Sequence, residues 1–186
     1  MNDSETRMNH LVHDQFLREL GHIVVSFSLL EDEIQFFLMA FINEPQRVGL
    51  ALTTEMSFRN LKAGIISVFI EKQGRGPDFE RVKLLVNRAG KCEEERNRIF
   101  HSEWTCDEVD VATHVFRSKE TAKEKHGLRG DSQEYTVENL RAFGDSLLNL
   151  AADFSDLLQE FVERKMANDS RGPAVPYGNG DTNVEG

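Results

Sequence analysis

Proline and cysteine are scarce in this chain of 186 residues. Two of its four prolines fall within the last fifteen residues, so most of the chain is free to form long helices. The two cysteines, Cys92 and Cys106, are too few for a disulfide framework. We interpret them as free thiols in a reducing cytosol.

The chain also lacks long apolar segments. No run approaches the roughly 18 consecutive apolar residues that a membrane-spanning helix needs. The first ten residues, MNDSETRMNH, lack the basic flank and apolar stretch of a secretory signal. These absences predict a cytoplasmic protein that makes no use of a membrane.

Acidic residues outnumber basic ones: the chain has 32 aspartates and glutamates and 22 lysines and arginines, which gives a net charge of −10. Such a balance opposes non-specific binding to nucleic acid, which depends on neutralising phosphates with cationic side chains. Any contact with RNA must therefore be local, in a pocket where a few cations converge.

Apolar residues make up 39% of the chain, enough for a core, and phenylalanine is frequent. They recur every three or four residues in several segments, as the buried face of a helix requires. The first such segment runs from about Glu5 to Asn43-Glu44-Pro45-Gln46, where the proline ends the helix. Its apolar stripe is Leu11, Leu17, Leu20, Ile23, Val24, Phe27, Leu30, Ile34, Phe37, Leu38 and Phe41.

Four further segments follow along the chain. We predict a short helix at Gln46–Thr54, a helix capped by Ser57, a helix capped by Asp78, and a final helix capped by Thr136. Between the last two, the helical period is lost. Residues 109–118 alternate weakly, as in an extended arm or a short hairpin strand, whereas residues 118–134 are charged and predict a solvated loop.

Together these segments predict an all-α fold, a helical bundle of four to five helices with an irregular insertion before the last helix. The bundle should occupy residues 5–166. Residues 167–186 lack core-forming side chains and predict a flexible C-terminal tail.

The stretch EEERNRIFHSEW, residues 93–104, ends the third long helix with side chains suited to phosphodiester chemistry. Asn97 and His101 are four residues apart and share a helix face, which the long side chain of Arg96 can reach. A histidine can take or give a proton near neutral pH, and a guanidinium can stabilise negative charge on phosphate oxygens. RNA supplies its own 2′-hydroxyl nucleophile, so cleavage by this trio needs neither a metal nor a cofactor.

Cleavage needs both a base and an acid, and a single histidine supplies only one group for proton transfer. A two-fold homodimer that joins two copies of the trio would supply the second histidine and double the local positive charge.

The segment Arg96-Asn97-Arg98-Ile99-Phe100-His101 resembles the R-x(4–6)-H motif of HEPN domains, in the form where asparagine follows the arginine. The order of helices is also similar over roughly residues 8–166. The resemblance implies a dimeric helical bundle acting as a metal-independent endoribonuclease, often a toxin or defence effector with an antitoxin partner. It also implies that Arg96 stabilises the phosphate, that Asn97 is its polar companion and that His101 is catalytic. Other members are inactive, so the alternative is a non-catalytic helical dimerisation or nucleotide-binding module.

Two positions depart from the family pattern, and two more residues are secondary candidates for the site. Ser102 stands where many relatives carry glycine, and Glu103 replaces the tyrosine of one toxin branch, which argues against that branch's nucleotidyltransferase antitoxin. Trp104 is first a packing residue and second a base-stacking one. Glu31 is either a surface carboxylate or a side chain that orients the motif. No cluster of metal ligands is evident.

Overall fold

The computed structural model describes residues 14–42, 45–105, 114–123 and 127–169. Within them lie five helices and one antiparallel sheet of three strands in the order β1-β2-β3. The helices are α2 (Asp14–Ile42), α3 (Gln46–Thr53), α4 (Phe58–Gln73), α5 (Pro77–Phe100) and α6 (Val137–Asp169), and the strands are β1 (Glu103–Thr105), β2 (His114–Lys123) and β3 (Gly127–Thr136). The predicted helical bundle is confirmed. The predicted helix start at Glu5 lies outside the described residues.

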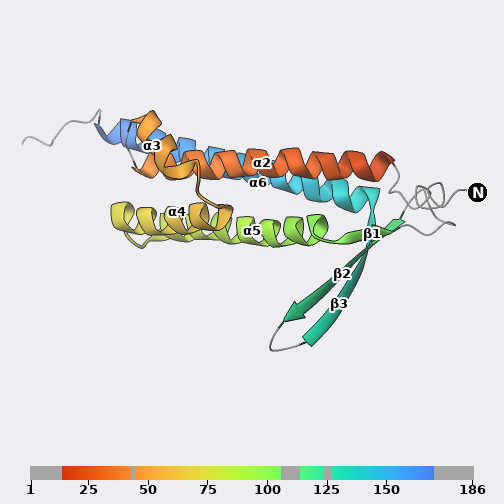
Figure 1. The fold of residues 1–186 in the computed structure, drawn as a ribbon. Helices are drawn as coiled ribbons and strands as arrows, with labels where there is room; N and C mark the ends of the chain where they lie inside the picture. The colour runs from red at the N-terminus through yellow and green to blue at the C-terminus, as the bar shows by residue number, and fades with distance from the viewer. Residues whose placement is uncertain (1–13, 43–44, 106–113, 124–126, 170–186) are drawn as a thin grey trace, which may run out of the picture.

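The four long helices form two layers (Figure 1). Helices α2 and α6 lie side by side in one layer, and α4 and α5 lie in the other. The last turns of α5 run past the N-terminal end of α4 and lead into the sheet, which projects from that end of the bundle (Figure 1). The C-terminal ends of α2, α4 and α6 lie at the opposite end of the bundle.

The core follows the predicted helical stripes. Phenylalanine dominates it, because large aromatic side chains bury much apolar area in a small number of residues. Phe37 packs edge-on against Phe154 and Phe161, with ring centroids 5.7 and 6.2 Å apart, and these contacts join α2 to α6. The largest fully buried side chains come from all four long helices: Phe16, Ile23, Leu30, Ile34, Phe37, Leu38, Ile65, Phe69, Ile99, Leu140 and Phe154.

The stripe predicted for α2 is wrong at two positions. Leu17 and Val24 are 53% and 43% exposed, while neighbouring Phe16 and Ile23 are fully buried. They begin an exposed apolar face on α2 that continues through Val25, Leu29 and Phe36. None of the described helices combines the length and the apolar character that crossing a membrane requires.

The helix caps agree with the sequence at two of three places. Ser57 accepts a hydrogen bond from the Asn60 amide at 3.3 Å, and Thr136 and Asn139 bond each other's backbone amides at 3.1 and 3.3 Å. The prediction for Asp78 is wrong. Gly76 is the N-cap of α5, because Pro77 fixes the first helical position and moves Asp78 into the first turn.

The charged segment before α6 is a hairpin and not a solvated loop. Strand β2 pairs with β3 from His114 opposite Thr136 to Lys123 opposite Gly127, and β1 pairs with β2 from Glu103 opposite Ser118. Backbone pairing satisfies the amide and carbonyl groups without any need for apolar side chains, so a charged composition does not exclude strands. The insertion is therefore ordered over residues 114–123 and 127–136.

The C-terminal boundary also differs from the prediction. Helix α6 continues to Asp169, past the expected end of the bundle at residue 166. The remainder of the predicted tail, residues 170–186, lies outside the described residues.

Candidate functional site

Arg96 of α5 lies between two aromatic rings. Its Cζ atom is 5.2 Å from the ring centroid of Phe27 in α2 and 5.4 Å from that of Phe100, one turn further along α5. Its Nη1 atom donates to Oδ1 of Asn97 at 3.0 Å. The side chain is half-buried, so the rings and the amide fix the plane of the guanidinium while part of it still faces solvent.

The Nε atom of Arg96 is buried and makes no hydrogen bond to any residue that the structure describes. A buried, unpaired N–H is costly, and such groups are rare in folded proteins. The remaining guanidinium nitrogens give this arginine the capacity to hold two phosphate oxygens.

The acidic run before the motif is engaged with other partners. Glu93 accepts a hydrogen bond from Nζ of Lys62 at 2.6 Å, and this ion pair joins α5 to α4. Glu95 pairs with Arg98 at 2.8 Å and accepts a hydrogen bond from the Tyr135 hydroxyl. Within the described chain, neither carboxylate forms an ion pair with Arg96. Among the described residues, an ion pair with Glu93 or Glu95 that would lock the Arg96 side chain structurally is therefore not formed.

Glu31 of α2 faces the arginine. Burial raises the pKa of this carboxyl above its ordinary value, the charge of Arg96 lowers it, and the negative charges of Asp32 and Glu93 raise it further. The carboxylate is thus a nearby countercharge for Arg96 in a partly dehydrated position. Whether Glu31 orients the motif, one of the two alternatives drawn from the sequence, stays a prediction.

The pKa of Glu31 gives a prediction about stability. A carboxyl whose folded-state pKa is raised lowers stability as the pH rises through that pKa, because the fold disfavours its charged form. Glu31→Gln is therefore expected to melt about 1–2 °C above the wild type at pH 7, a small gain because solvent screens the half-exposed charge. The difference should vanish below about pH 4, where the carboxyl is protonated.

Differential scanning calorimetry across this pH range measures the effect, and the exposed Glu94→Gln serves as control. A lower melting temperature for Glu31→Gln at pH 7 would mean that the attraction to Arg96 outweighs the cost of burial.

His101 is the residue at which α5 ends. Its backbone N–H donates to the Asn97 carbonyl at 3.1 Å, and its φ and ψ angles of −105° and 33° lead the chain out of the helix. The imidazole is exposed to solvent. Arg96 and Asn97 thus lie in the last turns of α5, and His101 is its C-cap, at the end that projects beyond α4.

The other histidine whose side chain the structure describes lies elsewhere. His22 of α2 faces α6, where its ring nitrogens are 3.6 Å from Glu19 and 3.7 Å from Asp145. A methyl group on Gly144 would come within 2.5 Å of the imidazole, so α6 approaches closely at this glycine. His22 therefore belongs to the α2–α6 interface, and within the described residues His101 has no second histidine beside it.

Trp104 of β1 contributes to packing. Its indole N–H donates to the Ile99 carbonyl at 3.0 Å, and its ring lies 5.4 Å from that of Tyr135 in β3. These contacts fix the sheet to the end of α5. The packing role, the first of the two considered from the sequence, accounts for this placement.

Two contributors to the site were missed by sequence reasoning. Phe27 was assigned only to the core stripe, and Lys62 was not singled out. Neither carries a local signal, because their roles arise from the approach of α2 and α4 to α5. Among the described residues, no group of three or more histidine, cysteine, aspartate or glutamate side chains is close enough to hold a metal ion.

Comparison of the chain with protein-family models, with curated proteins and with solved structures found no match.

Proposed function

We propose that the protein is a metal-independent endoribonuclease of HEPN type that acts as a homodimer. The observation that supports this most strongly is the guanidinium of Arg96, held between Phe27 and Phe100 and bonded to Asn97, one turn from an exposed histidine. A planar, half-buried guanidinium in a fixed orientation is suited to a phosphate in the transition state.

The reaction is an internal transesterification. The 2′-oxygen of the RNA forms a bond to phosphorus and the bond from phosphorus to the 5′-oxygen breaks, which leaves a 2′,3′-cyclic phosphate and a 5′-hydroxyl. One proton leaves the 2′-hydroxyl and one is delivered to the 5′-oxygen. In this proposal His101 performs one transfer and His101 of the partner subunit performs the other, while Arg96 stabilises the charge on the phosphate.

The exposed apolar face of α2 supports the homodimer. Leu17, Val24, Val25, Leu29 and Phe36 are all at least 43% exposed, and large apolar side chains left exposed along one helix are typical of an interaction surface. Val24 lies one turn before Phe27, the ring that contacts Arg96, so this part of α2 is near the motif. A second copy docked here would bring the two sites together and concentrate positive charge on an acidic chain.

The experiment that tests the proposal is an RNA cleavage assay in EDTA with wild type and His101→Ala. Wild type is expected to cleave in the chelator, and the variant to lose at least about 100-fold in rate because a proton-transfer group is removed. Lys91→Ala, an exposed change on the same helix, is the control and should cleave like the wild type.

Equal cleavage by wild type and His101→Ala would identify a contaminating nuclease and count against the proposal. Cleavage that disappears in EDTA would count against the metal-independent mechanism.

A second candidate, the non-catalytic dimerisation or nucleotide-binding module, is favoured by Glu31. Its carboxylate lies close enough to act as a countercharge for Arg96, which reduces the positive charge available to stabilise a transition state. In this case the wild type would bind an RNA oligonucleotide with an Arg96-dependent affinity and leave it intact. The toxin or defence role and the antitoxin partner follow only if the first candidate holds.

A further inference from the structure

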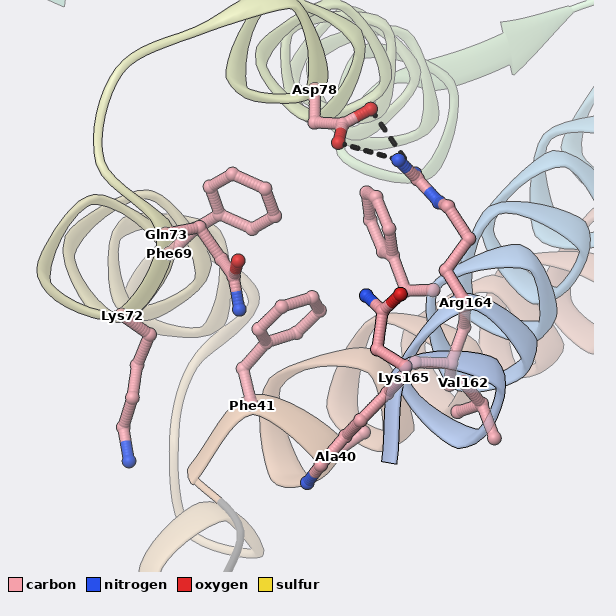
Figure 2. Close-up of a pocket in the computed structure, with 12 residues that line it drawn as sticks. Ala40, Phe41, Phe69, Lys72, Gln73, Asp78, Val162, Arg164 and Lys165 are labelled. Atoms are coloured by element: carbon pink, nitrogen blue, oxygen red, sulfur yellow. Dashed lines mark hydrogen bonds and ion pairs between the residues drawn. The ribbon is translucent and has the colours of Figure 1, made fainter. Parts of the chain in front are cut away.

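An open cavity of about 500 Å³ lies at the end of the bundle opposite the motif. Figure 2 shows it between the C-terminal turns of α2, α4 and α6, with the first turn of α5 beside it. Its volume falls within the range of about 300–1,000 Å³ that is usual for small-molecule sites.

The apolar wall of the cavity is aromatic. Phe41, Phe69 and Phe161 come from three different helices, and their ring centroids are 5.0, 5.5 and 5.7 Å apart. Phe41 and Phe161 are only half-buried, because they face the cavity. Rings left partly exposed in this way gain burial when an apolar group covers them.

The polar rim is cationic. Lys72, Arg164 and Lys165 line the opening together with a single carboxylate, that of Asp78. Asp78 accepts hydrogen bonds from Arg164 at 2.8 and 3.1 Å, and this contact holds its pKa below the ordinary value. The rim thus carries three positive charges and one negative charge on a chain whose net charge is −10.

Lys72 is the most available of these cations. Among the residues that the structure describes, it has no carboxylate partner, whereas Arg164 is paired with Asp78 and Glu160. Figure 2 shows Lys72 on the α4 side of Phe41 and Lys165 on the α6 side. The amides of Gln73 and Asn168 lie on the same lining and offer further hydrogen-bond donors.

Both lysines also lie near helix C-termini, where cations complement the helix dipole. That role accounts for their charge but not for the two half-buried phenylalanine rings, Phe41 and Phe161, that face the cavity between them. An organic cation would be repelled by the rim, and a compact inorganic anion would leave the aromatic wall exposed. A ligand that satisfies both parts has an apolar body and an anionic group.

We propose that this cavity binds a small amphipathic carboxylate, with its chain or ring on Phe41, Phe69 and Phe161 and its carboxylate at Lys72. This inference does not depend on the proposed ribonuclease activity, because the cavity and the motif lie at opposite ends of the bundle (Figure 1).

The test uses the full-length protein and the fluorescent probe 1-anilinonaphthalene-8-sulfonate, which pairs an aromatic body with an anionic group. The probe is expected to bind saturably. Decanoate should displace it, and decylamine, with the same chain and a cationic headgroup, should not. Lys72→Glu is expected to raise the dissociation constant for decanoate about tenfold, because a charge-assisted contact is lost and a repulsive one gained. Lys91→Glu on α5 makes the same charge change outside the cavity and should leave the constant unchanged.

A second variant tests the apolar wall. Ala40 is an exposed residue at the opening, so Ala40→Phe places a ring in the cavity without altering the core, and it should abolish displacement by decanoate. Two results would overturn the proposal. One is equal displacement by decanoate and decylamine, and the other is a dissociation constant for decanoate that Lys72→Glu and Ala40→Phe both leave unchanged.

Discussion

Replacing Arg96 with lysine is expected to lower the rate of RNA cleavage by about 100-fold, even though the charge is kept. The guanidinium is planar, stacks between Phe27 and Phe100 and offers paired N–H groups, whereas an ammonium is a point charge that can do neither. Single-turnover cleavage of a short RNA in EDTA measures the effect. The loss should appear mainly in the rate of the chemical step, because the substrate is still attracted electrostatically.

Arg98→Lys is the matched control, since Arg98 is an exposed arginine two positions further along the helix that pairs with Glu95. It should cleave within about twofold of the wild type, as expected for an exposed pair of little energetic weight. If Arg96→Lys cleaved as fast as the control, Arg96 would be a structural arginine and the proposed role would be wrong. The melting temperature of Arg98→Lys should match the wild type, and circular dichroism should show Arg96→Lys folded at the assay temperature, which separates catalysis from folding.

Phe154→Ala is expected to lower the free energy of unfolding by about 3–5 kcal/mol, a large fraction of the stability of a domain of this size. Phe154 is fully buried on α6, and its ring meets Phe37 of α2 edge-on at 5.7 Å. Removing the ring leaves a cavity between the two helices with the most extensive contact in the bundle. Urea unfolding followed by circular dichroism measures the change.

Leu84→Ala provides the control for this core substitution. Leu84 is an apolar residue of α5 that is 61% exposed, so its loss should cost less than about 1 kcal/mol. Equal destabilisation by the two variants would contradict the expected dependence of the free energy of unfolding on burial.

The helices were predictable because their signals are local. Apolar spacing located α2, α4, α5 and α6, and the side chains of Ser57 and Thr136 marked two helix starts correctly. Asp78 was misplaced as a cap because an aspartate before an apolar run fits both the cap and the first turn. The preceding Gly76-Pro77 pair decided between them.

The exposed face of α2 and the hairpin were harder to predict from the sequence. Leu17 and Val24 are as apolar as the residues beside them, and only the positions of the neighbouring helices determine which side is buried. The charged strands β2 and β3 are specified by pairing with each other, a non-local contact that leaves no clear period in the sequence.

The candidate site was predictable in its motif but not in its surroundings. Spacing alone placed Arg96, Asn97 and His101 on the last turns of one helix. The partners that give the arginine its setting, Phe27 and Glu31, come from α2 and precede it by 69 and 65 residues in the sequence. Tertiary packing brings these two residues to Arg96. It also brings Lys62 of α4 to Glu93, with which it forms an ion pair.

The joint between α5 and β1 restricts how the chain can change in length. Only the C-cap His101 and Ser102 separate the end of α5 at Phe100 from the first residue of β1. One extra residue there would either shift β1 by one position against β2 or break the hydrogen bond from the His101 backbone N–H to the Asn97 carbonyl. A one-residue shift moves every strand side chain to the other face. Trp104 would then lose the Ile99 carbonyl and the ring of Tyr135. Insertions and deletions in related sequences should therefore accumulate between β2 and β3 and be selected against at residue 102.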